Sequence, residues 1–136
     1  MDNNTPSIYT ALYWLVQDKQ IESKIFFTFL DFFWPKFIKK DNYIFLEEKY
    51  SEERYQELLK KKINPEFWIN LLTVDSYFEN EDDFEEKSIV LAKALVDIWQ
   101  AKLKLDFPNL EIIVNYVCDT DVGDYGITFY QQMPFI

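Results

Sequence analysis

The sequence contains no histidine, one cysteine, one arginine and two glycines in 136 residues. Without histidine, the chain lacks the parts for a Ser-His-Asp triad, a Cys-His dyad or a histidine-based metal site. A single thiol also excludes Cys-x-x-Cys redox motifs and cysteine zinc clusters. Because the two glycines, Gly123 and Gly126, stand together in one late turn, a P-loop and a dinucleotide-binding fingerprint are absent. We therefore expect a protein that is not an enzyme and that binds neither a cofactor nor a metal ion.

The lone cysteine, Cys118, excludes an internal disulfide and favours a reducing compartment. Residues 1–4 lack the basic and apolar regions of a signal peptide. The most apolar stretch, residues 25–34, contains Asp31 and is too short to span a bilayer. We expect a cytoplasmic protein that is not embedded in a membrane. Since no lysine or arginine lies close to Cys118 in the sequence, we interpret this residue as a small buried apolar side chain.

The net charge of −10 comes almost wholly from two segments. Residues 1–74 sum to −1 and residues 87–104 sum to +3, whereas residues 75–86 carry seven acids and residues 105–136 carry five, neither with a base. Binding along a nucleic acid needs clustered lysine and arginine, and Arg54 is the only guanidinium. The charge pattern therefore argues against nucleic acid as a direct ligand.

Periodicity and terminal signals predict four or five helices. Cap residues followed by proline start two of them, at Thr5-Pro6 and Asn64-Pro65. Ser51 is a further expected N-cap, and Pro35 should end or kink the second helix near Trp34. The predicted helices span about residues 5–18, 21–38, 51–62, 64–72 and 84–106.

Two of these helices, residues 21–38 and 84–106, have only a narrow polar stripe and are otherwise apolar. Such a pattern is typical of a helix that is buried on most sides. The tryptophans also fall on the apolar faces of predicted helices, so we expect all four to share one core. They are Trp14, Trp34, Trp68 and Trp99.

A hairpin is predicted at the C-terminal end. Residues 110–118 are β-branched and alternating, residues 127–132 form a second run, and both glycines lie in the loop between them. The short run Tyr43–Leu46 follows the turn-like Asp41-Asn42 and is a third candidate strand. The predicted fold is α+β, with four to five helices packed with a small antiparallel sheet dominated by the C-terminal hairpin, in a single domain over residues 1–136.

The densest run of charge is interleaved with aromatic residues, a combination suited to a basic protein partner because acids steer its approach and rings supply contact area. The structural alternative is a solvated loop followed by the acidic first turn of a helix, where carboxylates suit the helix dipole. The candidate partner-binding residues are Tyr77, Phe78, Glu79, Glu81, Asp82, Asp83, Phe84, Glu85 and Glu86, together with Asp119, Asp121 and Asp124 of the second acidic segment.

Residues 119–124 have a faint likeness to a calcium-binding loop because they supply three aspartates. The EF-hand pattern places glycine sixth and a bidentate glutamate twelfth, whereas here Gly123 is fifth and Tyr130 is twelfth. We interpret the segment as a solvated hairpin loop, which explains the same residues.

The leading functional hypothesis is a protein that binds a basic protein partner through its acidic surface. One form of it is an immunity- or antitoxin-like inhibitor of a basic toxin, which is an analogy of class without a motif. The first alternative is a module that binds an apolar small molecule in an aromatic-lined pocket between the second helix and the sheet. A carboxylate-based enzyme is a further alternative, although no spacing singles out a pair of carboxylates. The high aromatic content also leaves a homodimer open.

Overall fold

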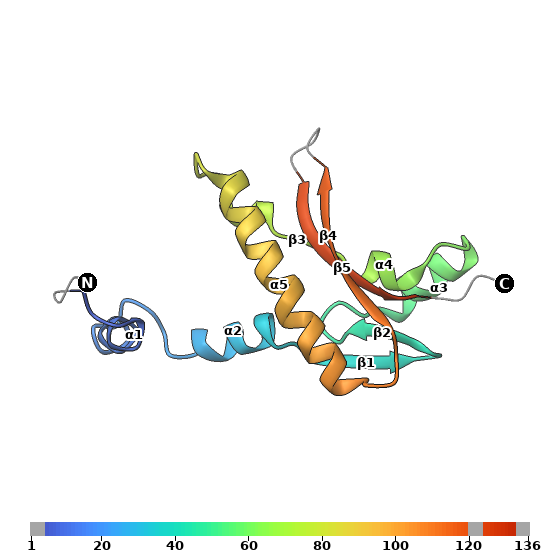
Figure 1. The fold of residues 1–136 in the computed structure, drawn as a ribbon, viewed down its shortest axis with the longest axis horizontal. Coiled ribbons are helices and arrows are strands. Elements are labelled where there is room, and N and C mark those ends of the chain that lie inside the picture. The colour runs from blue at the N-terminus through green and yellow to red at the C-terminus, as the bar shows by residue number, and fades with distance from the viewer. Residues whose placement is uncertain (1–4, 120–123, 133–136) are drawn as a thin grey trace. The chain divides into compact units, whose positions relative to one another are not determined.

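The computed structural model describes residues 5–119 and 124–132. The chain divides into two compact units, residues 1–32 and residues 33–136, which we call the N-terminal unit and the C-terminal unit and describe separately. The described residues form five α-helices, one 3-10 helix and five short strands in two antiparallel sheets. The predicted α+β class and the C-terminal hairpin are therefore confirmed (Figure 1).

The N-terminal unit holds α1 (Ile8–Gln17) and α2 (Ile25–Phe33), whose last residue lies in the C-terminal unit. Ser7 caps α1, since its side-chain oxygen accepts a hydrogen bond from the backbone N–H of Thr10 at 3.2 Å. The cap expected at Thr5 is therefore wrong by two residues.

Neither α1 nor α2 contains a buried residue. The expectation that the aromatic second helix is buried on most sides is wrong: Phe29 is 50% exposed and Leu30 is 58% exposed. The physical reason lies in the C-terminal unit, where the face of the hairpin is covered by the later helix α5 (Phe84–Asp106). An apolar helix becomes buried only where another surface packs on it.

The C-terminal unit begins with a hairpin of β1 (Phe37–Lys40) and β2 (Tyr43–Leu46). Asp41 and Asn42 form the turn between them with φ angles of 51° and 79°, the left-handed conformation that two-residue hairpin turns require. Two helices follow, α3 (Glu52–Lys60) and α4 (Pro65–Ile69).

Ser51 and Asn64 cap these helices as predicted. The Ser51 hydroxyl accepts from the N–H of Arg54 at 3.3 Å, and the Asn64 Oδ1 accepts from the N–H of Glu66 at 2.9 Å. Local side-chain chemistry is sufficient to set both helix starts.

The second sheet has the strand order β3-β5-β4. The strands are β3 (Leu72–Thr73), β4 (Ile112–Asp119) and β5 (Asp124–Gln131), and the 3-10 helix η1 (Asp75–Phe78) follows β3. The sequence predicts helix up to residue 72 and loop over residues 73–83, so β3 and η1 are departures from this prediction.

Gly126 lies within β5 and not in the turn, because it pairs with Thr73 of β3. A Cβ atom at this position would run into the carbonyl of Leu72. Glycine therefore allows a close approach of the two strands here.

The core of the C-terminal unit lies between α5 and the second sheet. Leu95, Trp99 and Leu103 of α5 are fully or almost fully buried, and the Trp99 ring meets Phe129 edge-to-face with centroids 6.1 Å apart. A second cluster packs α3 and α4 against the first hairpin, through Phe45, Tyr55, Leu58 and Ile69.

Only Trp99 of the four tryptophans is buried. Trp14, Trp34 and Trp68 are 57%, 42% and 46% exposed, so the shared tryptophan core is a wrong prediction. A tryptophan is buried only if its own side of the helix has a partner: Trp99 lies on the side of α5 that packs on the second sheet, whereas α4 meets the sheets through Glu66 and Ile69 and leaves Trp68 exposed.

The two sheets are joined by buried polar side chains of α4. The Asn70 Oδ1 accepts from the N–H of Leu46 at 2.9 Å, and its Nδ2 donates to the carbonyls of Ile44 at 2.9 Å and Phe129 at 3.2 Å. Asn70 therefore bridges β2 and β5, which do not pair directly.

Glu66, four residues before Asn70, lies on the same face of α4 and completes this bridge. Its carboxylate accepts from the N–H of Ile44 at 2.8 Å, from the N–H of Gln131 at 3.0 Å and from the Gln131 side chain at 2.7 Å. Three donors satisfy a side chain that is 1% exposed, which is why a carboxylate is tolerated there.

Among the described helices, none is both long and apolar enough to cross a membrane.

Candidate functional site

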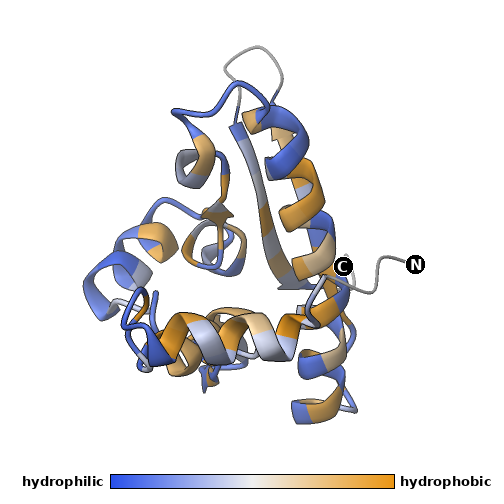
Figure 2. Ribbon diagram, turned by 90° about the vertical axis from the view of Figure 1, so that its left-hand side faces the viewer, coloured by the Kyte–Doolittle hydropathy of each residue, from blue (hydrophilic) through white to orange (hydrophobic). Residues whose placement is uncertain are grey.

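The two acidic segments meet at one end of the C-terminal unit. In Figure 1, the start of α5 and the open ends of β4 and β5 lie at the same end. Asp119 and Asp124 face each other as the last pair of the hairpin ladder. Figure 2 shows that the segment between η1 and α5 is hydrophilic and lies at the same end as the open end of the hairpin. Asp121 lies outside the described residues.

Two interactions fasten η1 to the start of β5. The N–H of Val74 donates to the carbonyl of Tyr125 at 2.7 Å, and the N–H of Tyr125 donates to the Asp75 carboxylate at 2.9 Å. The same tyrosine also meets α5: burial raises the pKa of the Tyr125 phenol, and the nearby Glu85 carboxylate, to which it is hydrogen-bonded, raises it further. Tyr125 of β5 thus forms hydrogen bonds with the η1 segment through its backbone and with α5 through its side chain.

Lys87 is the cation that this end of the molecule holds. Its ammonium group contacts the Glu81 carboxylate closely and the Asp83 carboxylate at 3.5 Å. The hydrogen bond to Glu81 is the largest cause of the raised pKa of Lys87. These two predicted site residues are therefore partly neutralised by the protein itself.

Other predicted residues stay exposed. Glu79, Asp82 and Glu86 are exposed, and no lysine or arginine among the described residues lies within 4.0 Å of their carboxylates. Asp119 and Asp124 are also exposed. We define the acidic face as the nine carboxylates Asp75, Glu79, Glu81, Asp82, Asp83, Glu85, Glu86, Asp119 and Asp124.

The three predicted aromatic contact residues differ in exposure. Tyr77 of η1 is 56% exposed beside the acids, whereas Phe78 and Phe84 are half-buried. The phenylalanines anchor η1 and the start of α5 to the rest of the unit. Tyr77 is thus the most exposed of the three rings.

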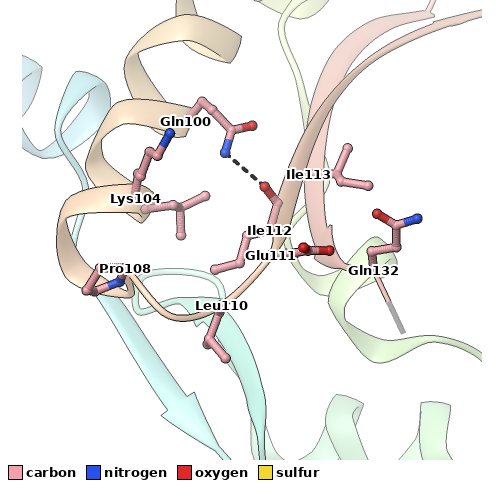
Figure 3. Close-up of a pocket in the computed structure, with 9 residues that line it drawn as sticks. Gln100, Lys104, Pro108, Leu110, Glu111, Ile112, Ile113 and Gln132 are labelled. Carbon is pink, nitrogen blue, oxygen red and sulfur yellow. Dashed lines mark hydrogen bonds between the residues drawn. The ribbon is translucent and has the colours of Figure 1, made fainter. Parts of the chain in front are cut away.

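A cavity of about 360 Å³ lies near the other end of α5. Figure 3 shows the side chain of Gln100 reaching from α5 to the carbonyl of Ile112 at its wall. Lys104 and Glu111 supply opposite charges and no aromatic residue contributes. This cavity is therefore unlike the aromatic-lined pocket predicted for an apolar ligand.

An aromatic-lined cavity of about 310 Å³ lies within the N-terminal unit. Phe26 of α2 forms one wall, and α1 forms the other with Tyr9 and Tyr13. The predicted pocket had the sheet as its second wall. The hypothesis of an apolar ligand stays a prediction.

Cys118 is exposed near the end of β4, so its interpretation as a buried residue is wrong. Alternation along the strand predicts the side that Cys118 faces, but not where the cover provided by α5 ends. Among the described residues, no three cysteine or carboxylate side chains come together as metal ligands would. The calcium-loop likeness falls mainly on residues 120–123, outside the described residues.

Sequence reasoning missed two parts of this site. The Lys87–Asp83 ion pair has a signal that could have been read, since the two residues are spaced i, i+4. The tie between Asp75 and Tyr125 spans 50 positions and has no local signal. No protein-family model matches the chain, and no curated protein or solved structure matches it.

Proposed function

We propose that this is a non-catalytic cytoplasmic protein that captures a basic protein partner with its acidic face. The observation that carries the proposal is the meeting of both acidic segments at one end of the C-terminal unit (Figure 1). The acidic face holds nine carboxylates, of which Glu81 and Asp83 are paired with Lys87. Like charges gathered on one surface steer an oppositely charged partner and raise its association rate.

The chemistry of this surface favours a protein over a nucleic acid. Carboxylates repel phosphates, whereas they pair with the lysines and arginines of a basic protein. Tyr77, at 56% exposure, adds the aromatic contact area in which protein interfaces are enriched. Tyr77 and seven of the nine carboxylates of the acidic face lie within residues 75–86.

The finer form of the proposal is an immunity- or antitoxin-like inhibitor. A toxin that acts on nucleic acid carries a basic surface for phosphates, and a compact set of carboxylates would occupy that surface. What supports this form is the net charge of −10 together with the local density of the acidic face, and it adds the requirement that binding blocks the activity of the partner.

A matched pair of charge variants tests the proposal. One triple variant neutralises the acidic face at Glu79→Gln, Asp82→Asn and Glu86→Gln. The control neutralises three exposed acids elsewhere, at Glu47→Gln, Glu48→Gln and Glu53→Gln. Each variant changes the net charge from −10 to −7 by removing three acids, so only the position of the lost charge differs.

Affinity capture from the native cell with wild-type protein and both variants should identify a basic protein. We expect the control to keep this partner and the acidic-face variant to lose most of it. With the purified partner, the acidic-face variant should associate about ten-fold or more slowly at low salt, with a weaker salt dependence. Equal capture and equal association rates for the two variants would contradict the proposal.

A further inference from the structure

The hydrogen-bonding direction of each strand in the second sheet follows from contacts outside the hairpin. On the side of β5 away from β4, backbone groups form hydrogen bonds with the segments at η1 and α4. These groups belong to Tyr125, Phe129 and Gln131. Directly opposite residues of an antiparallel pair either exchange hydrogen bonds or both point away. The residues opposite them, Cys118 and those at positions 114 and 112, therefore direct their backbone groups to the outer edge of β4.

The first half of this outer edge is covered by a side chain. Gln100 of α5 donates to the carbonyl of Ile112 at 2.8 Å and accepts from the N–H of Val114 at 3.2 Å, and the first of these bonds is drawn in Figure 3. The amide of Gln100 imitates one peptide group of a neighbouring strand. These two bonds also show that the backbone N–H and C=O groups of the even-numbered residues of β4 point to the outer edge.

Within residues 5–119 and 124–132, no side chain covers the second half of the edge in this way. By the same alternation, Tyr116 and Cys118 direct their N–H and C=O groups outward, and no strand among the described residues pairs with β4 on this side. The start of α5 meets Tyr125 of β5 through Glu85, Lys93 reaches the Tyr116 ring, and the hydrogen bonds from α5 to the edge come from Gln100. Figure 1 shows α5 and the hairpin separating toward this end.

We propose that the outer edge of β4 from Tyr116 to Cys118 accepts an extended strand of the partner that carries lysine or arginine. The proposal rests on the proposed function and adds the way in which the partner binds: exposed backbone groups of an edge strand pair with an added strand. Residue 119, an exposed aspartate, ends this edge and belongs to the acidic face.

Side chains beside the edge fit a strand that alternates basic and apolar residues. Val90 of α5 is 65% exposed, and it lies three residues before Lys93, whose ammonium group stands 5.8 Å from the centre of the Tyr116 ring. Residues three apart share a side of a helix, so an apolar contact and one cation flank the edge. The Lys93 ammonium opposes a basic residue at mid-strand, whereas the Asp119 carboxylate favours one at the end of the edge.

A second copy of the chain is a poorer occupant than a basic strand. Pairing of β4 with its own copy would bring two acidic faces together, each with nine carboxylates and with only Lys87 and Lys93 as the cations described near it. Repulsion between them disfavours that arrangement. A dimer joined along β4 is thus one of the results that would overturn the proposal.

Amide hydrogen exchange of the full chain, followed by NMR, tests the strand addition. The probe is a blocked octapeptide of alternating lysine and valine. We expect the amides of Tyr116 and Cys118 to exchange rapidly in the free protein and at least about ten-fold more slowly in the complex. The amide of Val117, which faces β5, should be protected in both states.

Two control peptides separate the strand proposal from the proposed function. One keeps the lysines but is N-methylated at two adjacent central residues, which blocks both of its hydrogen-bonding edges. The other replaces lysine with glutamate. Binding of the first with the same affinity as the parent peptide would overturn strand addition while leaving capture by the acidic face intact. Binding of the glutamate peptide as tightly as the lysine peptide would overturn the proposed function.

The variant Cys118→Pro gives a second readout. Proline removes an outward N–H, so the β4–β5 ladder keeps its bonds, and protection of the Val117 amide reports that the hairpin is intact. Loss of about ten-fold or more in affinity for the lysine peptide is expected. Unchanged affinity in the folded variant, or saturation without protection at Tyr116 and Cys118, would overturn the strand proposal; should the variant not fold, the N-methylated peptide decides.

Discussion

The N-terminal and C-terminal units are built from similar apolar residues and use them differently. In the described part of the N-terminal unit, no residue of α1 or α2 is buried. In the C-terminal unit, α3 is among the most polar helices of the chain, yet it buries Tyr55 and Leu58. The apolar content of a segment therefore does not determine its burial. Burial depends on which surface reaches the segment in the folded chain.

Within the C-terminal unit, the residues that stabilise the fold differ from those proposed to bind a partner. The core around Trp99 and the polar bridge of Glu66 and Asn70 hold the C-terminal unit together. The acidic face, the proposed binding surface, lies at one end of this unit. Side chains on a well-packed scaffold are held in position for a partner.

The largest expected effect on the free energy of unfolding comes from a tryptophan of the C-terminal unit, and a tryptophan of the N-terminal unit serves as its comparison. Trp99→Ala removes a ring that is 2% exposed, and Trp14→Ala removes one that is 57% exposed. We expect Trp99→Ala to lower the free energy of unfolding by about 3–5 kcal/mol and Trp14→Ala to change it by about 0.5 kcal/mol or less. Chemical denaturation measures both. Equal losses would remove the contrast between the units.

The bridge between the two sheets should give the next largest effect. Asn70→Ala leaves buried backbone groups of Ile44, Leu46 and Phe129 without their partner, so we expect a loss of about 2–4 kcal/mol. Asn64→Ala on the same helix removes only the N-cap and should cost about 1 kcal/mol. Similar losses for the two variants in chemical denaturation would show that Asn70 does not join the sheets.

The smallest effect concerns stability at alkaline pH. Burial, followed by the hydrogen bond to Asp41, raises the pKa of Tyr55 to about 12, and burial, followed by Cys118, raises the pKa of Tyr116 to about 12. A raised pKa means that the folded state favours the neutral phenol. This contribution is complete below pH 10, the ordinary value, and is lost as the pH rises toward 12. Tyrosinate absorbance and circular dichroism should therefore change together in that window, and tyrosinate formation complete near pH 10 would contradict burial of these rings.

Local signals predicted the parts of the fold that depend on neighbours in the sequence. Ser51, Asn64-Pro65 and the long periodic segment from residue 84 to 106 place α3, α4 and α5 correctly. The alternation of residues 110–118 predicts β4, although the strand ends at Asp119. The single-domain prediction stays untested, since the two units are described separately.

The remaining features depend on contacts between distant residues. Glu66 reads as an exposed acid in the first turn of a helix, and only the approach of Ile44 and Gln131 makes it a buried acceptor. In the same way, the composition gives two acidic segments, but the tie between Asp75 and Tyr125 brings them together. Charge counts along the chain predict the acidic residues of the candidate site. They do not predict that the two segments lie at the same end of the C-terminal unit.

Hydrogen–deuterium exchange of the full chain with its captured basic partner compares the two units most directly. We expect slower exchange on binding in residues 75–86 and in β4, with residues 5–32 unchanged. Protection confined to α1 and α2, with unchanged exchange at the acidic face, would overturn capture by the acidic face and move the binding surface to the N-terminal unit.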